Sequence, residues 1–260
     1  MNFKDHFSAR AELYAKYRPH YPAELFEWIA SLVSKHDVVW DCAAGSGQAS
    51  AGLAEHFERV IATDASEKQI AMAEPHERIE FRVAKSDASG LPDQSVNMIT
   101  VAQAIHWLEH DSFYREARRV MRPDAAIVIW GYGDPVIDDP ALDRIVHDYN
   151  RGTIEKYWMP ERDLILLGLR TIPFPFREIE SPAFKMKHEW TLEQLAGYMR
   201  TWSATAKYAE AINGDPVATV ENELATLWGA DTHTITWPIH IRAGYCFVDA
   251  ADSGNRTNLA

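Results

Sequence analysis

Cysteine is scarce in this chain, which has only Cys42 and Cys246 among 260 residues. Two cysteines without a Cys-x-x-Cys pair exclude a disulfide framework and predict a reducing compartment, so we expect a cytoplasmic location. The 11 histidines show no His-Glu-x-x-His motif or other paired-ligand spacing. The sequence therefore gives no support for a metal site.

Long apolar runs and an excess of basic residues are also missing. No stretch approaches 18 uncharged apolar residues, and Met1–Phe7 has no apolar signal core, so we expect neither a membrane span nor a secretory leader. The 26 Lys and Arg are outnumbered by 38 Asp and Glu, which gives a net charge of −12. Nucleic-acid binding needs a cationic face, so the acidic balance favours a small-molecule partner and argues against nucleic acid.

Strands and helices alternate through the first half of the chain. The apolar patterns predict strands at 38–42, 59–63, 79–84, 97–102 and 126–130, with helices at 48–57, 66–73 and 111–121 between them. This alternation is typical of an α/β fold with a mostly parallel, Rossmann-like sheet. The stretch 79–83 alternates apolar and polar residues and predicts a strand near an edge, whereas the continuously apolar 127–130 predicts a central strand.

After residue 130 the pattern becomes mainly helical. We expect helices at about 140–158, 191–212 and 216–229, which we interpret as a lid, and two late strands at 183–188 and 233–241 that add an antiparallel pair to the sheet edge. The predicted organisation is one large domain: N-terminal helices over 1–34, an α/β core over 35–130, the lid with the last strands over 131–248, and a tail over 249–260.

The most informative motif is the stretch from Val38 to Gln48, where an apolar strand runs into Asp41 and a turn of small residues. Between Ala43 and Gly47 the side chains are minimal, so a ligand can approach the backbone closely and a helix can begin at once. The next predicted strand ends at Asp64, a position from which a carboxylate can bind ribose hydroxyls. The pattern predicts a cofactor that contains ribose.

Residues 35–130 resemble the cofactor site of class I S-adenosylmethionine-dependent methyltransferases. The resemblance implies that Gly45 and Gly47 pack against the methionine part and adenosine, and that Asp64 binds both ribose hydroxyls. It further implies that Asp87 accepts a hydrogen bond from the adenine amino group and that Asp41 lies near the methionine amino group. Ser86 or Asp93 are alternatives to Asp87.

The resemblance extends to neighbouring residues and includes two departures. Ala65 and Ala88, which follow two of these acids, are also expected to bind cofactor. Ala43 stands where such enzymes usually have the first glycine, and it still allows close approach if its φ is negative. Asp124-Ala125 replaces the Gly-Gly that commonly precedes the fifth strand.

Segments outside this turn resemble the subgroup that contains the trans-aconitate methyltransferases, namely Tyr14 to Pro22, Ala102 to Trp107 and Thr201 to Ser203. In that subgroup the N-terminal segment closes over the cofactor. Tyr14 and Arg18 are four residues apart, hence on one helical face, and the Arg18 guanidinium can pair with the methionine carboxylate. The plainer interpretation of Arg18 is a surface ion pair. Gln103 follows the fourth strand and is expected to reach the methionine part or the substrate.

Several residues are candidates for the acceptor side of the site. His106 is either a base or, together with Trp107, packing beneath the cofactor. The residues considered for an acceptor pocket under the lid are Tyr132, Trp202, His240, Arg242 and Tyr245, and aromatic residues of this kind are more often core. A cationic anchor for an acidic acceptor would be Arg242 or Arg177.

The resemblance implies transfer of a methyl group from S-adenosylmethionine to a small molecule, with S-adenosylhomocysteine as product. A carboxylate acceptor is already anionic at neutral pH and needs no base. A phenol or amine would instead require His106 or His240 as base.

A non-catalytic regulatory protein that retains the cofactor site is a further alternative. An NAD-dependent oxidoreductase is disfavoured because 45–50 lacks the third glycine or alanine of the dinucleotide fingerprint. We expect a monomer or homodimer.

Overall fold

The computed structural model describes residues 16–229 and 231–247 of the chain. Within them, nine strands form one sheet in the order β3-β2-β1-β4-β5-β9-β6, and β7 and β8 also pair with β9. The strands are β1 Val38–Cys42, β2 Arg59–Asp64, β3 Ile79–Val83, β4 Val96–Ala102, β5 Met121–Tyr132, β6 Val136–Ile137, β7 Arg177–Ile179, β8 Phe184–Trp190 and β9 His233–Tyr245. The helices are α2 Ala23–Ser31, α3 Gln48–Ala54, α4 Glu67–Ala71, α5 His110–Val120, α6 Pro140–Asp148, α7 Arg162–Leu166, α8 Leu192–Arg200, α9 Ser203–Ile212 and α10 Val217–Leu227.

Strands β1 to β5 form the parallel half of the sheet. Successive residues of a strand point to opposite faces, and here both faces are covered by helices. Val39 and Val128 pack in one cluster with residues of α2 and α3, whereas Trp40 and Ile127 pack in a second cluster with residues of α5. The α/β prediction is confirmed, with β3 at the edge and β5 inside the sheet.

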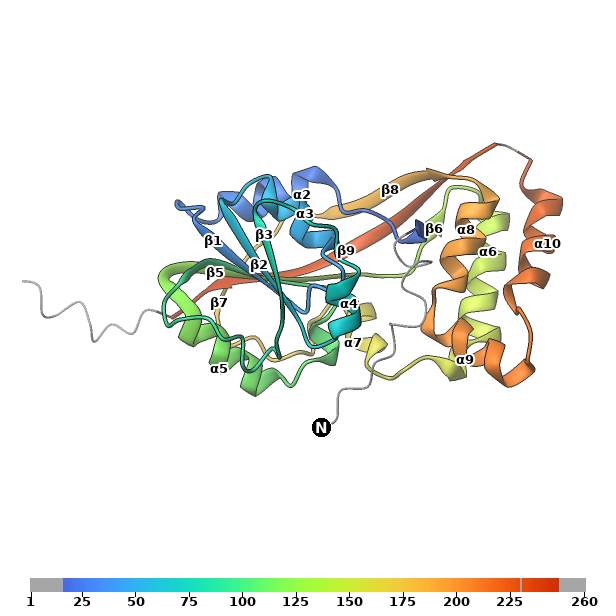
Figure 1. Cartoon of the computed structure of the whole chain (residues 1–260). Helices are drawn as coiled ribbons and strands as arrows, with labels where there is room; N and C mark the ends of the chain where they lie inside the picture. Colours follow the sequence, from blue (N-terminus) through green and yellow to red (C-terminus); the bar gives the residue numbers. More distant parts are fainter. Residues whose placement is uncertain (1–15, 230, 248–260) are drawn as a thin grey trace, which may run out of the picture.

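Strand β9 joins the parallel half of the sheet to the lid (Figure 1). Its 13 residues pair antiparallel with β5 over 239–245 and with β8 over 233–239. The predicted antiparallel pair is therefore present. It lies at the edge of the sheet as expected, with β9 next to β5 and with β6, β7 and β8 on the outer side of β9. The sequence analysis did not predict β6 or β7, which have only two and three residues.

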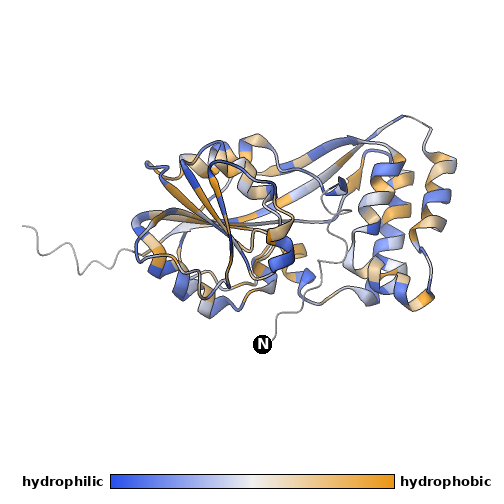
Figure 2. Cartoon of the chain, in the orientation of Figure 1, coloured by the Kyte–Doolittle hydropathy of each residue, from blue (hydrophilic) through white to orange (hydrophobic). Residues whose placement is uncertain are grey.

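Helices α6, α8, α9 and α10 gather at the far end of β9, apart from the helices that cover the parallel strands (Figure 1). The helix predicted over 191–212 is interrupted, because α8 ends at Arg200 and α9 begins at Ser203. The helix predicted over 140–158 ends at Asp148 and continues as a π-helical turn, Tyr149–Thr153, and a 3₁₀ turn, Glu155–Tyr157. Apolar and polar residues share each lid helix (Figure 2).

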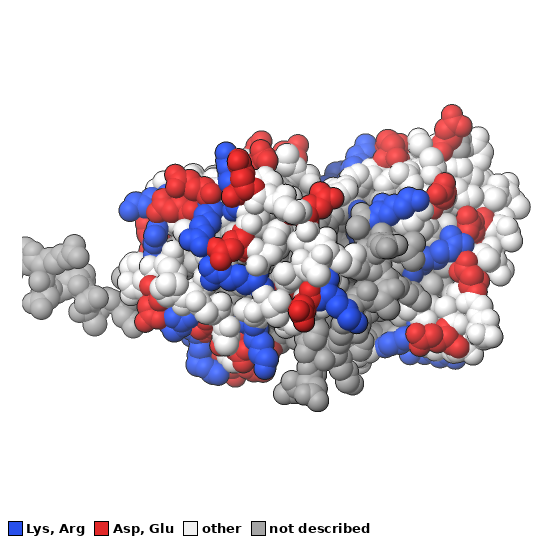
Figure 3. Space-filling model, in the orientation of Figure 1, with Lys and Arg blue, Asp and Glu red and all other residues white. Residues whose placement is uncertain are grey.

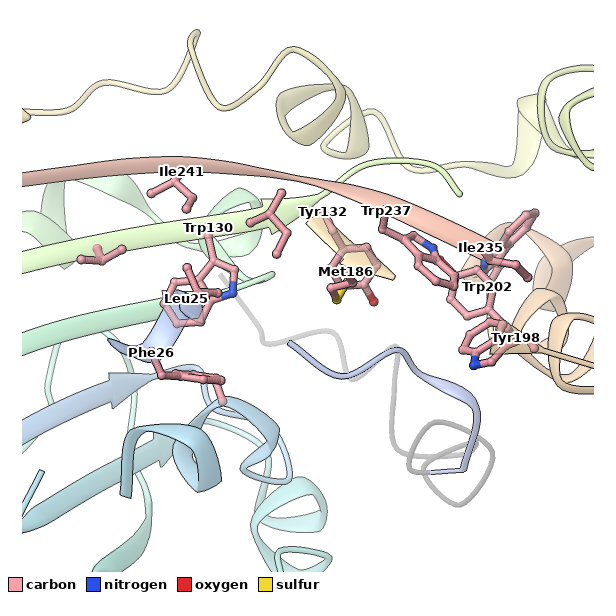
Figure 4. Packing of buried hydrophobic residues seen from close by; sticks show 14 of the residues in the cluster. Leu25, Phe26, Trp130, Tyr132, Met186, Tyr198, Trp202, Ile235, Trp237 and Ile241 are labelled. Carbon is pink, nitrogen blue, oxygen red and sulfur yellow. The ribbon is translucent and has the colours of Figure 1, made fainter. Parts of the chain in front are cut away.

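The lid shares its apolar core with one face of the sheet. The cluster that contains Leu25 and Trp130 continues along β9 through Ile241 and Trp237 to Tyr198 of α8 (Figure 4). Trp237 is fully buried, and its indole Nε1 donates to the Tyr198 hydroxyl at 3.0 Å. Because these side chains form one continuous cluster, the described part of the lid is packed on the core and has no separate apolar centre.

Acidic and basic side chains are interspersed on the surface that faces the viewer in Figure 3. Within 16–229 and 231–247, none of the helices combines the length and apolar character that crossing a bilayer requires.

Candidate cofactor and acceptor site

The carboxyl ends of β1 and β2 meet at the small-residue turn. The Asp64 carboxylate accepts hydrogen bonds from the Gly45 amide at 2.9 Å and from the Ser66 amide at 2.8 Å. The Ala44 amide donates to the Thr63 carbonyl at 3.0 Å. Asp64 is half-buried at the strand end. Its carboxylate oxygens have further lone pairs, so the side chain has capacity to accept from a ligand.

The turn has a left-handed backbone at three positions, with φ of +57° at Ala43, +60° at Gly45 and +91° at Gly47. The condition under which Ala43 would allow close approach, a negative φ, is therefore not met. An L-alanine in this region is strained, because its Cβ approaches the following carbonyl oxygen. Gly47 is buried, and a Cβ there would come within 2.7 Å of the Phe81 ring.

Asp41, which is predicted to lie near the methionine amino group, is fully buried. One carboxylate oxygen accepts from the Ser50 hydroxyl at 2.6 Å and the other from the Thr100 hydroxyl at 2.8 Å. Burial outweighs these two hydrogen bonds and raises the pKa of Asp41 to about 6. The carboxylate links β1 to α3 and β4 beneath the turn, so its observed contacts are structural.

Asp87 and Ala88 lie in an exposed turn just after β3, where Lys85 and Ala88 form a bridge. Ala65 is half-buried beside Asp64. The alternative Asp93 is bound to the Arg119 guanidinium, which also contacts Glu116. Both acids are exposed, but among the described residues only Asp93 is held by an arginine, and Asp87 is the acid that lies directly after β3.

Arg18 lies between the core and the lid. Its Nη1 donates to the Tyr132 hydroxyl at 2.7 Å, its Nη2 reaches the Thr201 carbonyl at 3.5 Å, and its guanidinium lies 5.4 Å from the centre of the Tyr198 ring. The preceding helix ends at Tyr17. Tyr14, the predicted companion of Arg18, lies outside the described residues.

Gln103 comes directly after β4 with a φ of +52°. Its side-chain amide pairs with the backbone of Tyr132: Oε1 accepts from the Tyr132 amide at 2.7 Å, and Nε2 donates to the Tyr132 carbonyl at 3.5 Å. These two hydrogen bonds bridge the ends of β4 and β5, and the contact of Gln103 with the methionine part or the substrate stays a prediction. The side chain still contributes to the wall of the pocket described next.

A pocket opens between the carboxyl ends of β4 and β5, α7 and the lid. Its walls contain five Trp and Tyr side chains, several aliphatic ones and a few charged ones. It is lined by Arg18, Gln103, His106, Trp107, Tyr132, Gly133, Asp134, Pro135, Trp158, Met159, Arg162, Ile165, Leu166, Tyr198, Trp202 and Ser203. Pockets that bind small molecules are typically apolar with a few placed polar groups, so this one fits a small acceptor.

His106 and Trp107 lie in a 3₁₀ turn, Ile105–Trp107, and both line the pocket. Their ring centres are 4.6 Å apart. The Nδ1 atom of His106 is buried and has no hydrogen-bond partner among the described residues. Burial lowers the pKa of His106 to about 4, so the imidazole is neutral at physiological pH.

His240, Arg242 and Tyr245 do not line this pocket, contrary to expectation. Arg242 binds Glu178 through Nε and Nη2 at 2.9 and 2.8 Å, and its Nη1 donates to the Ile172 carbonyl at 2.5 Å. His240 pairs with Gly131 across β9 and β5 and is half-buried.

The other two candidates, Tyr245 and Arg177, also make their contacts outside the pocket. The Tyr245 hydroxyl donates to the Leu32 carbonyl at 2.8 Å. Arg177, the alternative anchor, is exposed and lies over the Tyr245 ring. These side chains are bound by groups outside the pocket, so neither arginine is its cationic anchor.

The sequence analysis missed the pocket residues Asp134, Trp158 and Arg162. Asp134 and Arg162 come from separate segments, the loop after β5 and the first residue of α7, and form an ion pair. No motif links them in sequence. The one available signal was the Gly-Tyr-Gly-Asp-Pro loop at the carboxyl end of a central strand, where ligands bind in open α/β sheets.

Comparisons with known proteins agree with this arrangement. A family model described as a methyltransferase domain matches residues 40–129. A Dictyostelium discoideum protein named as a methyltransferase is 33% identical over 225 residues, which cover 85% of this chain and 86% of that protein. A Saccharomyces cerevisiae protein named as an S-adenosylmethionine-dependent methyltransferase is 25% identical, with 75% of this chain and 79% of that protein covered.

Solved structures give the same result. A structure from Anaeromyxobacter dehalogenans, described as a type II methyltransferase, is 41% identical and superposes with a TM-score of 0.82, covering 88% of this chain and 97% of that one. The chain therefore belongs to the S-adenosylmethionine-dependent methyltransferases. Its cofactor is S-adenosylmethionine.

The small-residue turn fits this cofactor. The direction in which a Cβ would project from Gly45 is open, with Gln69 Oε1 as the nearest atom at 3.8 Å. A ligand can therefore approach the backbone there, next to the half-buried carboxylate of Asp64.

Proposed function

We propose that this methyltransferase acts on a small molecule and methylates a carboxylate oxygen. The observation that supports the proposal most is the pocket at the ends of β4 and β5, where the Arg162 guanidinium lies beside the ring of Trp158. The aromatic residues of the wall suit a small organic acceptor, and a guanidinium that the cofactor does not use suits an anion. The resemblance to the trans-aconitate subgroup points to the same class of acceptor.

The cofactor is held, in this proposal, by the turn and by the acids that follow β2 and β3. Asp64 binds the ribose hydroxyls, with Ala65 beside it, and Asp87 and Ala88 contact the adenine. Gly45 offers its backbone to the methionine part, and Arg18 pairs with the methionine carboxylate. The residue after Arg18 is bonded to the residue after the turn, because the Pro19 carbonyl accepts a hydrogen bond from Gln48 Nε2 at 2.7 Å. Arg18 therefore lies beside both the cofactor turn and the pocket.

When bound, S-adenosylmethionine supplies an activated methyl group on a sulfonium. A carboxylate oxygen of the acceptor provides the electron pair for the new oxygen–carbon bond, the sulfur–carbon bond breaks, and its electron pair stays on sulfur. No proton is removed, so the protein contributes orientation and exclusion of water. Neutral His106, with its pKa near 4, is a weak base and suits this base-free reaction.

The test is release of S-adenosylhomocysteine from S-adenosylmethionine with a panel of carboxylic acids, phenols and amines. We expect turnover with acids and identification of a methyl ester by mass spectrometry. Turnover with phenols or amines alone would contradict the proposal and favour His106 as a base. Cofactor binding without turnover on any acceptor would favour the regulatory alternative.

Asp64→Ala should weaken binding of S-adenosylhomocysteine at least tenfold, because one or two charge-assisted hydrogen bonds are worth roughly 1.5–3 kcal/mol each. Isothermal calorimetry measures the affinity. Asp93→Ala is the matched control, because that carboxylate is bound to Arg119 away from the turn. Equal affinities for the wild type and Asp64→Ala would overturn the role of Asp64.

A further inference from the structure

Arg162 is the first residue of α7 and projects into the pocket. Its guanidinium lies 3.9 Å from the centre of the Trp158 ring, and its Nη2 donates to Asp134 Oδ1 and, at 3.1 Å, to Asn150 Oδ1. The side chain is only 14% exposed. Stacking and two hydrogen bonds through one nitrogen therefore hold the guanidinium in place.

The unusual feature of Arg162 is that the N–H groups on two of its three guanidinium nitrogens, Nε and Nη1, are not used by the part of the protein that the structure describes. Among the described residues, Nε and Nη1 form no hydrogen bond with protein, and the side chain lines the pocket. A guanidinium has five N–H donors, and both of its bidentate edges include Nη2. The two Nη2 hydrogens point to Asp134 and Asn150, so neither bidentate edge is available to a ligand. The N–H groups of Nε and Nη1 can therefore bind a ligand carboxylate only through single hydrogen bonds.

A purely structural ion pair does not account for this arrangement. Asp134 is shared, because its second carboxylate oxygen lies 3.0 Å from Nη2 of Arg151. Arg151 also contacts Glu155 at 3.6 Å, so the two guanidinium groups face two carboxylates, but Arg162 contacts Asp134 through a single nitrogen. A buried cation with unused donors is costly unless an anion completes its hydrogen bonds.

We propose that Arg162 binds one oxygen of the acceptor's carboxylate and leaves the other oxygen free to attack the methyl group. This inference rests on the proposed carboxylate methylation and assigns the residue that selects an acid. A bidentate arginine would occupy both carboxylate oxygens. Arg162, restricted to single contacts by Asp134 and Asn150, orients the carboxylate through one oxygen while the nucleophilic oxygen keeps its lone pairs. Asp134 is a positioning residue in this scheme.

The experiment measures acceptor binding without turnover. Cinnamate and its neutral amide, cinnamamide, are titrated by calorimetry into the full-length protein saturated with S-adenosylhomocysteine. We expect the wild type to bind the acid at least tenfold more tightly than the amide, and Arg162→Gln to lose that preference. Arg162→Lys, which keeps a cationic group, should retain part of it.

Arg151→Gln is the matched control, because Arg151 binds the same carboxylate, Asp134, but does not line the pocket. It should keep the preference for the acid. Affinity for S-adenosylhomocysteine, equal in all variants, reports that they are folded. A wild type without preference for cinnamate, or an Arg162→Gln variant that keeps the preference, would overturn the assignment.

The two proposals fail in different ways. If carboxylic acids are not methylated but Arg162→Gln still loses the preference for the acid, the proposed reaction is wrong and the binding role of Arg162 stands. If acids are methylated and Arg162→Gln methylates them with an unchanged KM, the reaction stands and the role of Arg162 is wrong.

Discussion

At the scale of single residues, the turn after β1 combines two different demands on side-chain size. Among the described residues, a Cβ at Gly45 would meet only Gln69 Oε1, at an ordinary contact distance of 3.8 Å, so the left-handed φ of +60° is what favours glycine there. Gly47 needs room for Phe81, because the ring occupies the space where a Cβ would project. Ala43 adopts a left-handed φ without being a glycine. Of the two glycines, only Gly47 is required by the packing of a neighbouring side chain.

Gly47→Ala should lower the free energy of unfolding by about 2–4 kcal/mol, because a φ of +91° strains an alanine and its Cβ clashes with Phe81 at 2.7 Å. Chemical denaturation followed by circular dichroism measures the change. Gly152→Ala is the control, since a Cβ there meets nothing within 4 Å and its φ is not positive. Similar stabilities for the two variants would contradict the steric argument.

Asp41 makes the free energy of unfolding depend on pH, and the direction of this dependence follows from its raised pKa. Its folded pKa of about 6 lies above the ordinary value of 3.8, because burial disfavours the charged form. The protonated form therefore stabilises the fold below pH about 4, and this contribution is lost as the pH rises through about 6. The difference between the two pKa values corresponds to about 3 kcal/mol.

Asp41→Asn removes this titration and keeps a side chain of the same shape for Ser50 and Thr100. The free energy of unfolding of the variant minus that of the wild type should rise by about 3 kcal/mol between pH 4 and pH 7. Urea denaturation of both proteins across this range measures the difference, in which other titrating groups cancel. A difference that is constant with pH would refute the argument.

At the scale of secondary-structure elements, the ends of the lid helices are specified locally. Helix α8 begins with a capping box, in which Thr191 Oγ1 accepts from the Gln194 amide at 3.3 Å and Gln194 Oε1 accepts from the Thr191 amide at 2.9 Å. Such reciprocal bonds satisfy donors that have no partner within the helix. The break before α9 places Trp202 in the pocket wall.

Thr191→Ala should destabilise the protein by about 1 kcal/mol through loss of the cap and lower the melting temperature by roughly 2–4 °C. Differential scanning calorimetry measures both effects. Thr226→Ala is a suitable control, because the Thr226 hydroxyl only bonds back to the Glu223 carbonyl within α10. Equal melting temperatures for the wild type and Thr191→Ala would contradict a role for the cap.

At the scale of the whole molecule, β9 makes the lid a continuation of the sheet. One half of the strand pairs with β5 and the other half with β8, and the apolar cluster follows it from Ile241 to Ile235 (Figure 4). A pocket built between core and lid therefore has walls that belong to one packed body. Charge-mediated contacts such as that of Arg18 with Tyr132 add to this connection.

We therefore expect one cooperative thermal transition, with equal calorimetric and van't Hoff enthalpies. Leu224→Ala, a change of a fully buried residue in α10, should move the whole transition and cost about 2–5 kcal/mol. Two resolved transitions, of which Leu224→Ala shifts only one, would show that the lid unfolds separately.

The alternation of strands and helices was predictable because the parallel strands β1, β2, β4 and β5 are largely buried on both faces and are mostly apolar, whereas β3 shows the alternating pattern of an edge strand. The glycine turn and Asp64 were predictable because the whole pattern lies within 27 residues, from Val38 to Asp64. It consists of a first strand, a turn of small residues, a helix and a second strand that ends in an acid. The structural role of Asp41 was not predictable, because its partners Ser50 and Thr100 come from different elements.

The sequence by itself determined the fold class, the position of the cofactor turn and the family, because these depend on local periodicity and on residues close together in the chain. Tertiary structure alone decided the acceptor pocket. It turned Arg242 toward Glu178, tied Gln103 to Tyr132 and brought Arg162 beside Asp134. These contacts join segments that are distant in sequence, and only the packing of the lid on the sheet brings them within reach of one another.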